Sequence, residues 1–160
     1  MKSEIVSQYN AALKMLFSTI DLCPDKLWID EEYENSFWRI VYHTLFYTSL
    51  YLSKNPQSFT TWSKHKENYN CLGNFTYDNK PIVINEIYSK EILTEYLKAI
   101  LEKVEISISE MEENKISEFN WIPGNELNRH LYNIRHIQHH TGQLVERLHC
   151  NKVKGIKWIG

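Results

Sequence analysis

Apolar residues recur at intervals of three or four along four stretches of the chain, a spacing that places them on one face of a helix. The first stretch ends at Cys23-Pro24, because proline disfavours helical geometry in the residue before it. The second stretch is apolar almost all round and should form the most buried helix. In order, the stretches contain Ile5, Tyr9, Ala12, Leu16 and Ile20; Phe37 to Leu50; Leu93, Leu97, Ile100, Val104, Ile108 and Met111; and Leu127, Leu131, Ile134, Thr141, Val145 and Leu148.

Residues that favour helix starts stand before the later stretches. Asn35-Ser36 precedes the second, Ser89 the third and Pro123-Gly124-Asn125 the fourth. The side-chain oxygens of the asparagines and serines can accept hydrogen bonds from the free N–H groups of a first turn. The fourth stretch ends before Asn151. Four amphipathic helices of this length predict an all-α fold, a four-helix bundle, in a single domain over residues 1–160.

The connection between the second and third helices, residues 55–88, is too long for an ordinary turn in a compact bundle. We expect it to cross over one end of the bundle and to contribute a lid. Residues 60–69 could hold a short helix. Aromatic side chains of this connection are expected to pack over that end of the bundle, namely Trp62, Tyr69, Phe75 and Tyr77.

Charge and cysteine content exclude several classes of protein. The 18 basic and 20 acidic residues are dispersed and leave a net charge of −2, so no basic patch for nucleic acid is indicated. Cys23, Cys71 and Cys150 form no paired motif, which argues against a disulfide framework and favours a reducing, cytoplasmic location. The amino terminus, Met1-Lys-Ser-Glu-Ile5, leads into an amphipathic pattern, and Arg39 and His43 interrupt the longest apolar stretch, so neither export nor membrane spanning is expected.

Three histidines on two of the predicted helices could bind one metal ion. His136 and His140 are four residues apart, so their rings lie about one helical turn apart on one face. His43 lies among apolar residues, where an unpaired ring would be costly to bury. The alternatives are two surface histidines and a core histidine bonded to a tyrosine or a backbone carbonyl. Neutral imidazoles are common ligands of zinc, nickel and related ions, whereas His139 points away and is expected at the surface.

Three segments resemble the DinB/YfiT-like superfamily of metal-binding four-helix proteins, and the resemblance spans essentially the whole chain. They are Trp38-Arg-Ile-Val-Tyr-His43, Tyr88-Ser-Lys-Glu-Ile92 and His136-Ile-Gln-His-His140-Thr-Gly-Gln143. Thr141 stands where many members carry arginine. The resemblance implies an up-down-down-up bundle that holds one divalent metal, commonly nickel or zinc, through His43, His136 and His140. It also implies a homodimer in many members.

A three-histidine site leaves a metal ion with an open position, as in catalytic zinc sites. Some members of the superfamily resemble transferases and isomerases that use small thiols such as bacillithiol or mycothiol. We therefore expect a metal-dependent transferase that activates a small thiol for attack on an electrophile. A metal-water hydrolase is the second possibility, with Glu95 or Glu146 as its base. The third is a binding or stress-response module in which the metal only ties two helices together.

Other residues could complete such a site, although each has a simpler interpretation. The arginines at positions 39, 129, 135 and 147 could line a thiol pocket or lie at the surface. Gln143 could orient a ligand through a hydrogen bond. Trp62, His65 and Tyr69 could close the site or supply a fourth ligand, or could simply pack. Cys71 and Cys150 have no convincing base and are expected to be incidental thiols. The segment 153–160 could pack on the core or on a partner.

Overall fold

The computed structural model describes residues 1–160 and contains helices but no strands, which confirms the predicted all-α class. Four helices are long, one is a single short turn of α-helix, and one is a short 3-10 helix. None of the helices combines the length and the apolar character needed to span a bilayer. The elements are α1 (Lys2–Leu22), α2 (Asp25–Trp28), α3 (Phe37–Leu52), η1 (Pro56–Ser58), α4 (Lys90–Glu110) and α5 (Glu126–Cys150).

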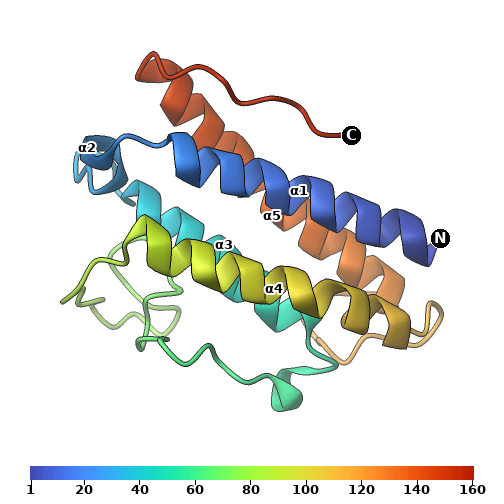
Figure 1. The fold of residues 1–160 in the computed structure, drawn as a ribbon. Coiled ribbons are helices and arrows are strands. Elements are labelled where there is room, and N and C mark those ends of the chain that lie inside the picture. Colours follow the sequence, from blue (N-terminus) through green and yellow to red (C-terminus); the bar gives the residue numbers. More distant parts are fainter.

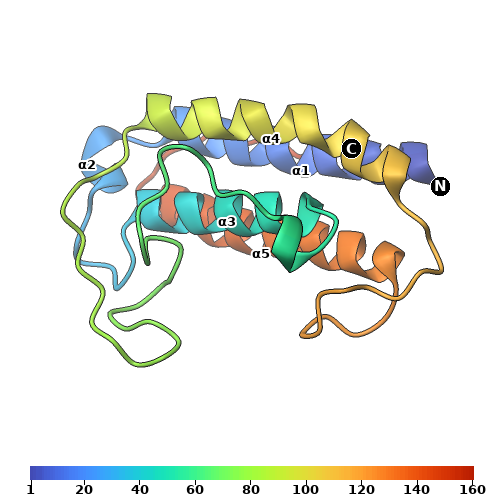
Figure 2. The same cartoon turned by 90° about the horizontal axis from the view of Figure 1, so that it is seen from below.

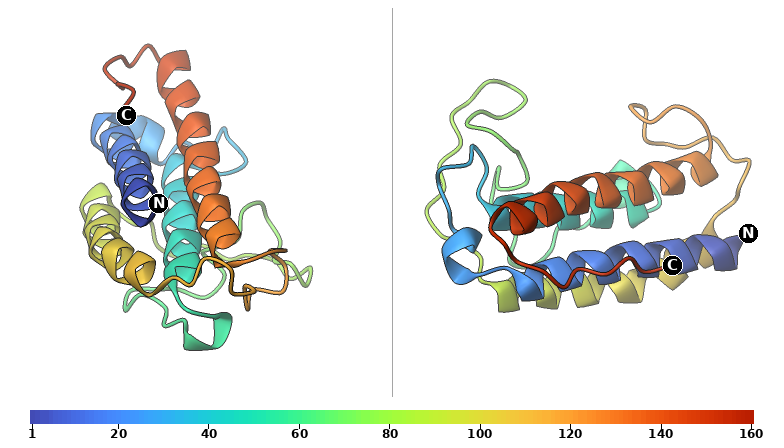
Figure 3. Two further views of the ribbon diagram at one scale, coloured as in Figure 1. Left: turned by 90° about the vertical axis from the view of Figure 1, so that its right-hand side faces the viewer. Right: turned by 90° about the horizontal axis from the view of Figure 1, so that it is seen from above.

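The four long helices lie side by side around a common core (Figures 1 and 3). Helix α1 packs against α4 and α5, and α3 packs against the same two helices. Helices α1 and α5 run toward the end of the molecule where α2 lies, and α3 and α4 run away from it (Figure 1). The parts of the two connections that follow η1 and α4 loop out on the side of α3 and α5 that is opposite α1 and α4 (Figure 2).

The predicted helix starts are found, with one difference at α3. The Ser89 hydroxyl accepts a hydrogen bond from the Ile92 N–H at 3.3 Å, and the Asn125 side chain accepts one from the Asn128 N–H at 2.9 Å. Ser36 precedes α3 without a side-chain cap. Its neighbour Asn35 instead accepts a hydrogen bond from the Gly73 N–H at 2.7 Å, so this position fastens the long connection to the start of α3.

Burial follows the predicted stripes for α1, α3 and α4. Nearly every side chain of α3 is buried, as its all-round apolar pattern predicts. The centre of the core is formed by apolar side chains from all four long helices, and each fully buried leucine or isoleucine among them contributes roughly 1.5–3 kcal/mol. Fully buried examples are Leu13 and Leu16 of α1, Leu45 of α3, Leu97 and Ile100 of α4, and Ile137 and Leu144 of α5.

Helix α5 departs from its predicted stripe. Leu131 was expected to be inside but is 49% exposed. Three polar residues of the same helix, Arg129, His130 and Asn133, are buried instead. The buried face of α5 is therefore set partly by polar side chains that find partners inside, which a count of apolar residues does not reveal.

The predicted helix at residues 60–69 is absent, and only η1 is regular in this connection. Distant side chains engage the backbone here: the Tyr88 hydroxyl donates to the Lys64 carbonyl, and the Tyr69 hydroxyl accepts from the N–H groups of Asn85 and Glu86. Asn68 has a φ of 65°, which is incompatible with a continuing helix. These contacts hold residues 60–69 in an ordered but non-helical conformation.

Aromatic packing in this connection is only partly as expected. Trp62 stacks on Tyr96 of α4 with ring centroids 4.4 Å apart, and Tyr69 is buried. Phe75 and Tyr77 were expected to pack but are exposed. The prediction is therefore right for the first part of the connection and wrong for the second.

Two further segments pack on the helices. The short helix α2 was not anticipated; it buries Trp28, whose indole N–H donates to the Tyr88 carbonyl at 2.9 Å. The carboxyl-terminal segment runs back beside α1 (Figure 3), with Val153 and Ile156 partly buried against the core of the same chain. The three cysteines are free, as expected from their spacing.

Candidate metal centre

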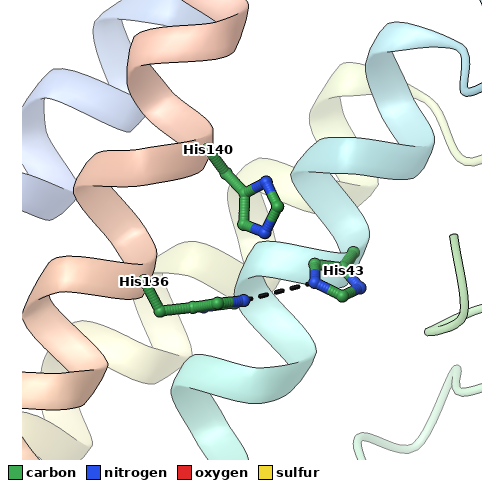
Figure 4. Close-up of side chains that lie close together, drawn as sticks. All are labelled: His43, His136 and His140. Carbon is green, nitrogen blue, oxygen red and sulfur yellow. Dashed lines mark hydrogen bonds between the residues drawn. The ribbon is translucent and has the colours of Figure 1, made fainter.

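The three histidines singled out in the sequence lie together in the structure. His43 comes from α3, and His136 and His140 come from α5. Their rings point toward one another in front of α3 and α5, with α1 and α4 behind (Figure 4). One ligand nitrogen from each ring lies within 4.8 Å of the other two. The cluster could therefore hold a metal ion.

The spacing of the nitrogens fits a transition metal. The Nε2 atoms of His136 and His43 are 3.2 Å apart. Zinc binds imidazole nitrogen at about 2.0–2.1 Å, and in a tetrahedron of that size the ligand atoms stand about 3.3–3.4 Å apart. Little movement of α3 relative to α5 is needed to bring this pair of rings into coordinating positions.

Hydrogen bonds orient two of the rings from behind. The Nδ1 of His43 donates to the Asn70 backbone carbonyl at 2.7 Å, and the Nδ1 of His140 pairs with the Gln143 side-chain oxygen at 2.7 Å. Because a proton on Nδ1 leaves Nε2 with a free lone pair, both residues present an acceptor nitrogen to the cluster. The hydrogen bond by which Gln143 could orient a ligand is therefore present, with the Gln143 oxygen as the acceptor.

His136 is arranged differently from the other two rings. Since His43 Nε2 carries no proton, the contact between the two Nε2 atoms requires His136 to donate. Its Nδ1 is buried without a hydrogen-bond partner. Ligation through Nε2 requires the proton of His136 to move to that Nδ1, whose hydrogen-bonding capacity is otherwise unused.

Burial keeps the cluster uncharged at neutral pH. It lowers the pKa of His43 to about 4, an effect opposed by the hydrogen bond to Asn70. Burial, with a smaller contribution from His140 and His43, lowers the pKa of His136 to about 3. Burial also lowers the pKa of His140. Divalent transition metals bind the neutral form of imidazole, so the cluster is in its ligating protonation state at pH 7.

Aromatic rings flank the cluster along α3. The ring centroid of Tyr47 is 4.7 Å from that of His43 and 5.8 Å from that of His136. Its hydroxyl shares a hydrogen bond with the Tyr77 hydroxyl at 3.1 Å and accepts one from the Asn70 side-chain amide at 3.4 Å. Burial raises the pKa of Tyr47, so the phenol beside the cluster stays protonated.

The two carboxylates considered as bases lie elsewhere. Glu95 pairs with Lys64 at 2.6 Å. Glu146 lies near His149, at the end of α5. Neither carboxylate is among the side chains that converge at the cluster.

The four candidate arginines serve mainly to hold connections. Arg39 donates to the carbonyls of Cys71 and Gly73, and Arg129 donates to those of Ser53 and Lys54. The remaining two lie over tyrosine rings, Arg147 over Tyr33 and Arg135 over Tyr132, and Arg147 also donates to the Asn35 carbonyl. Arg39 also lies near the cluster, since it precedes His43 by one turn of α3 and its charge contributes to the lowered pKa of His43.

The side chains of the long connection supply no ligand to the cluster. His65 shares a hydrogen bond with Tyr42 at 2.6 Å, and Trp62 and Tyr69 are engaged in packing and backbone contacts. The connection contributes a backbone carbonyl instead, that of Asn70. Sequence reasoning missed this group because any residue type can supply a carbonyl. His139 is exposed, as expected, but it does not point away from the cluster, since its ring lies edge-on to that of His140 with centroids 4.9 Å apart.

Comparisons with protein-family models, with curated proteins and with solved structures find no match for this chain. The interpretation of the site therefore rests on its geometry. That geometry consists of three converging imidazoles, the groups that orient two of them and a flanking set of aromatic rings.

Proposed function

We propose that this chain is a DinB/YfiT-like up-down-down-up bundle that binds one zinc or nickel ion through His43, His136 and His140. We further propose that it is a metal-dependent transferase that activates a small thiol. The observation that supports metal binding most strongly is that three neutral imidazoles from two helices converge within 4.8 Å. Outward hydrogen bonds from two of them, His43 and His140, leave Nε2 free to ligate.

The composition of the cluster favours chemistry over a purely structural metal. It provides three ligands and no fourth histidine, cysteine or carboxylate, whereas zinc takes four ligands in structural sites. A water molecule or a substrate atom would fill the remaining position. Neutral ligands leave the full charge of the ion in place, and a thiol coordinated to it is deprotonated at neutral pH.

Transfer of a thiol fits the surroundings better than hydrolysis. A hydrolase of this kind is helped by a base that takes a proton from the attacking water. Glu95 pairs with Lys64, Glu146 is exposed near His149, and neither belongs to the cluster. A coordinated thiol needs no such base, because coordination alone yields the thiolate.

Metal content and thiol conjugation test this proposal together. Protein purified without an affinity tag or a chelator should contain about one zinc or nickel ion per chain by elemental analysis. The loaded protein should conjugate a small thiol to an electrophile, the stripped protein should not, and added metal should restore the reaction. Undiminished turnover by stripped protein would reject the mechanism.

Two variants provide a matched pair for this experiment. His43→Ala removes a ligand and should abolish metal retention and conjugation together. His149→Ala removes an exposed histidine near the end of the same helix as the other two ligands and should leave both intact. Stable metal binding without any conjugation would instead favour a non-catalytic module in which the ion ties α3 to α5.

A further inference from the structure

Aromatic side chains gather around the buried ring of Tyr51 beside the histidine cluster, and we call this group the aromatic ledge. Tyr47 adjoins His43 and His136, and Tyr51 lies 5.9 Å from Tyr47 between ring centroids. Beyond Tyr51, the ring of Tyr132 follows at 5.4 Å. The ledge consists of Tyr47, Tyr51, Tyr77, Trp121 and Tyr132.

Two exposed residues of the ledge are held in place by hydrogen bonds to α3. Tyr77 is 82% exposed and bonds through its hydroxyl to that of Tyr47. Trp121 is 56% exposed, and its indole N–H donates to the Tyr51 hydroxyl at 3.3 Å. They come from the two connections that loop out on one side of α3 and α5 (Figure 2). Large aromatic rings that are both exposed and tethered at the edge of a candidate centre indicate a binding surface.

The shape of this surface restricts what it can hold. Two hollows of the molecule, one of about 320 Å³ lined by Glu126 and Arg129 and one of about 280 Å³ lined by Trp38 and Arg39, do not include the ledge, whose outer rings stand exposed at the surface. A ligand at the ledge is therefore held against a face rather than enclosed. Tyrosine rings have electron-rich faces, which attract flat, electron-poor rings in an offset stack.

We propose that the aromatic ledge binds a flat, electron-poor aromatic electrophile and presents it to the histidine cluster. Its role as a substrate subsite rests on the proposed thiol transfer, whereas its capacity to bind such a ring does not. In the reaction, the thiolate sulfur bonds to the ring carbon that carries a halide. The halide leaves with the bonding pair, and the thiol proton passes to solvent. The bound ring contributes the electrophilic carbon, and Tyr47 holds that ring beside His43.

Binding of an unreactive aromatic probe tests the ledge without any turnover. In a ligand-observed NMR titration, 1,3-dinitrobenzene should bind both metal-loaded and stripped protein, and nitrocyclohexane should bind much more weakly. Tyr47→Leu should weaken binding of the aromatic probe about two- to tenfold, the range of an aromatic pair. Tyr47→Phe keeps the ring and should restore most of the affinity. Trp158→Leu, a change in the exposed carboxyl-terminal segment, should have no effect.

Further measurements make the outcomes decisive. Zinc retention and circular dichroism of Tyr47→Leu should match those of the unchanged protein, which separates loss of the ring from loss of the fold. Equal affinity of Tyr47→Leu for dinitrobenzene, or equal binding of nitrocyclohexane, would overturn the proposal. So would a dimer in solution that Tyr77→Ser dissociates, since the ledge would then be an interface between two copies.

The ledge and the transferase can fail separately. Dinitrobenzene binding without thiol conjugation would leave the ledge standing and reject the transferase. Metal-dependent conjugation of the aliphatic electrophile iodoacetamide, without binding of the aromatic probe, would do the reverse.

Discussion

Two histidines of α5, His130 and His136, differ in a way that separates a structural role from the proposed ligating one. His130 lies in the core among the helices, and His136 lies in the cluster with His43. Burial lowers the pKa of both His130 and His136 to about 3. A displaced pKa therefore marks burial in each case and does not by itself identify a metal ligand.

The two environments differ in what the ring nitrogens meet. Arg129 donates to the Nε2 of His130 at 3.3 Å, so the proton of this ring lies on Nδ1 and is donated to the Tyr9 hydroxyl oxygen at 3.0 Å. Both nitrogens are thus occupied within the core. In the cluster, the Nε2 atoms of His136 and His43 instead face each other. Ring nitrogens that face one another across two helices, rather than burial, are what distinguish the cluster.

Removing one histidine from each environment should give the largest difference in zinc affinity. His136→Ala takes away a ligand and should weaken zinc binding by more than about 100-fold, since loss of an outer hydrogen-bond partner alone costs 10- to 100-fold. His130→Ala should leave zinc affinity within about threefold. Titration of stripped protein against a competing chelator measures both values. Equal losses in the two variants would show that His136 affects binding through the fold.

Loss of the hydrogen bond to the core histidine, His130, should instead lower the stability of the fold. Tyr9→Phe leaves the Nδ1 proton of His130 without its acceptor inside the core. The free energy of unfolding should fall by about 1–3 kcal/mol, the usual cost of an unsatisfied buried polar group. Urea titration of the stripped protein measures this loss, while zinc affinity should stay unchanged. A fall in zinc affinity of similar size would remove the distinction between the two environments.

The sequence predicts the cluster better than it predicts the core polar network. His43, His136 and His140 follow from helical spacing and from the apolar setting of His43, and helix caps such as Ser89 place α4 correctly. His130 was missed because its burial depends on Tyr9, which is far away in the sequence. Spacing along one helix reports which residues share a face, whereas contacts between helices decide which polar residues are satisfied inside.

The same limit explains the errors in the connections. The helix predicted at residues 60–69 is replaced by backbone contacts to Tyr69 and Tyr88, and the orienting carbonyl of Asn70 has no sequence signature. Leu131 was placed inside by its spacing but is exposed, because α5 is turned to bury polar residues. Long-range partners of the backbone cannot be read from local periodicity.

A smaller effect on the cluster should come from the hydrogen bond that orients His140. Gln143→Leu removes the acceptor of its Nδ1 proton. Zinc affinity should fall about ten- to hundredfold. Gln138→Leu is the matched control, since Gln138 lies on the same helix and makes only a long contact of 3.8 Å to the Met15 sulfur. Equal affinities for the two variants would show that Gln143 does not support the ligand.

The smallest change is expected when the pH is lowered from 7 to 5 with the fold intact. Protons compete with metal for imidazole, and an ordinary histidine with a pKa near 6.5 would weaken binding about 30-fold at pH 5. The pKa values of His43 and His136 in the folded chain are about 4 and about 3. Their protonation should therefore reduce zinc affinity less than about threefold over this range.

The stability of the stripped protein, unlike its zinc affinity, should change over the same pH range. The unfolded chain takes up protons on His43, His130 and His136 below pH 6.5, while the folded chain does not until pH falls toward 4. The free energy of unfolding of stripped protein should thus decrease as pH falls through this window. Zinc titrations at pH 7 and pH 5, limited to samples shown to be folded by circular dichroism, separate the two effects. A 30-fold loss of affinity in folded protein would mean that the ligands are more exposed to water than the cluster geometry indicates.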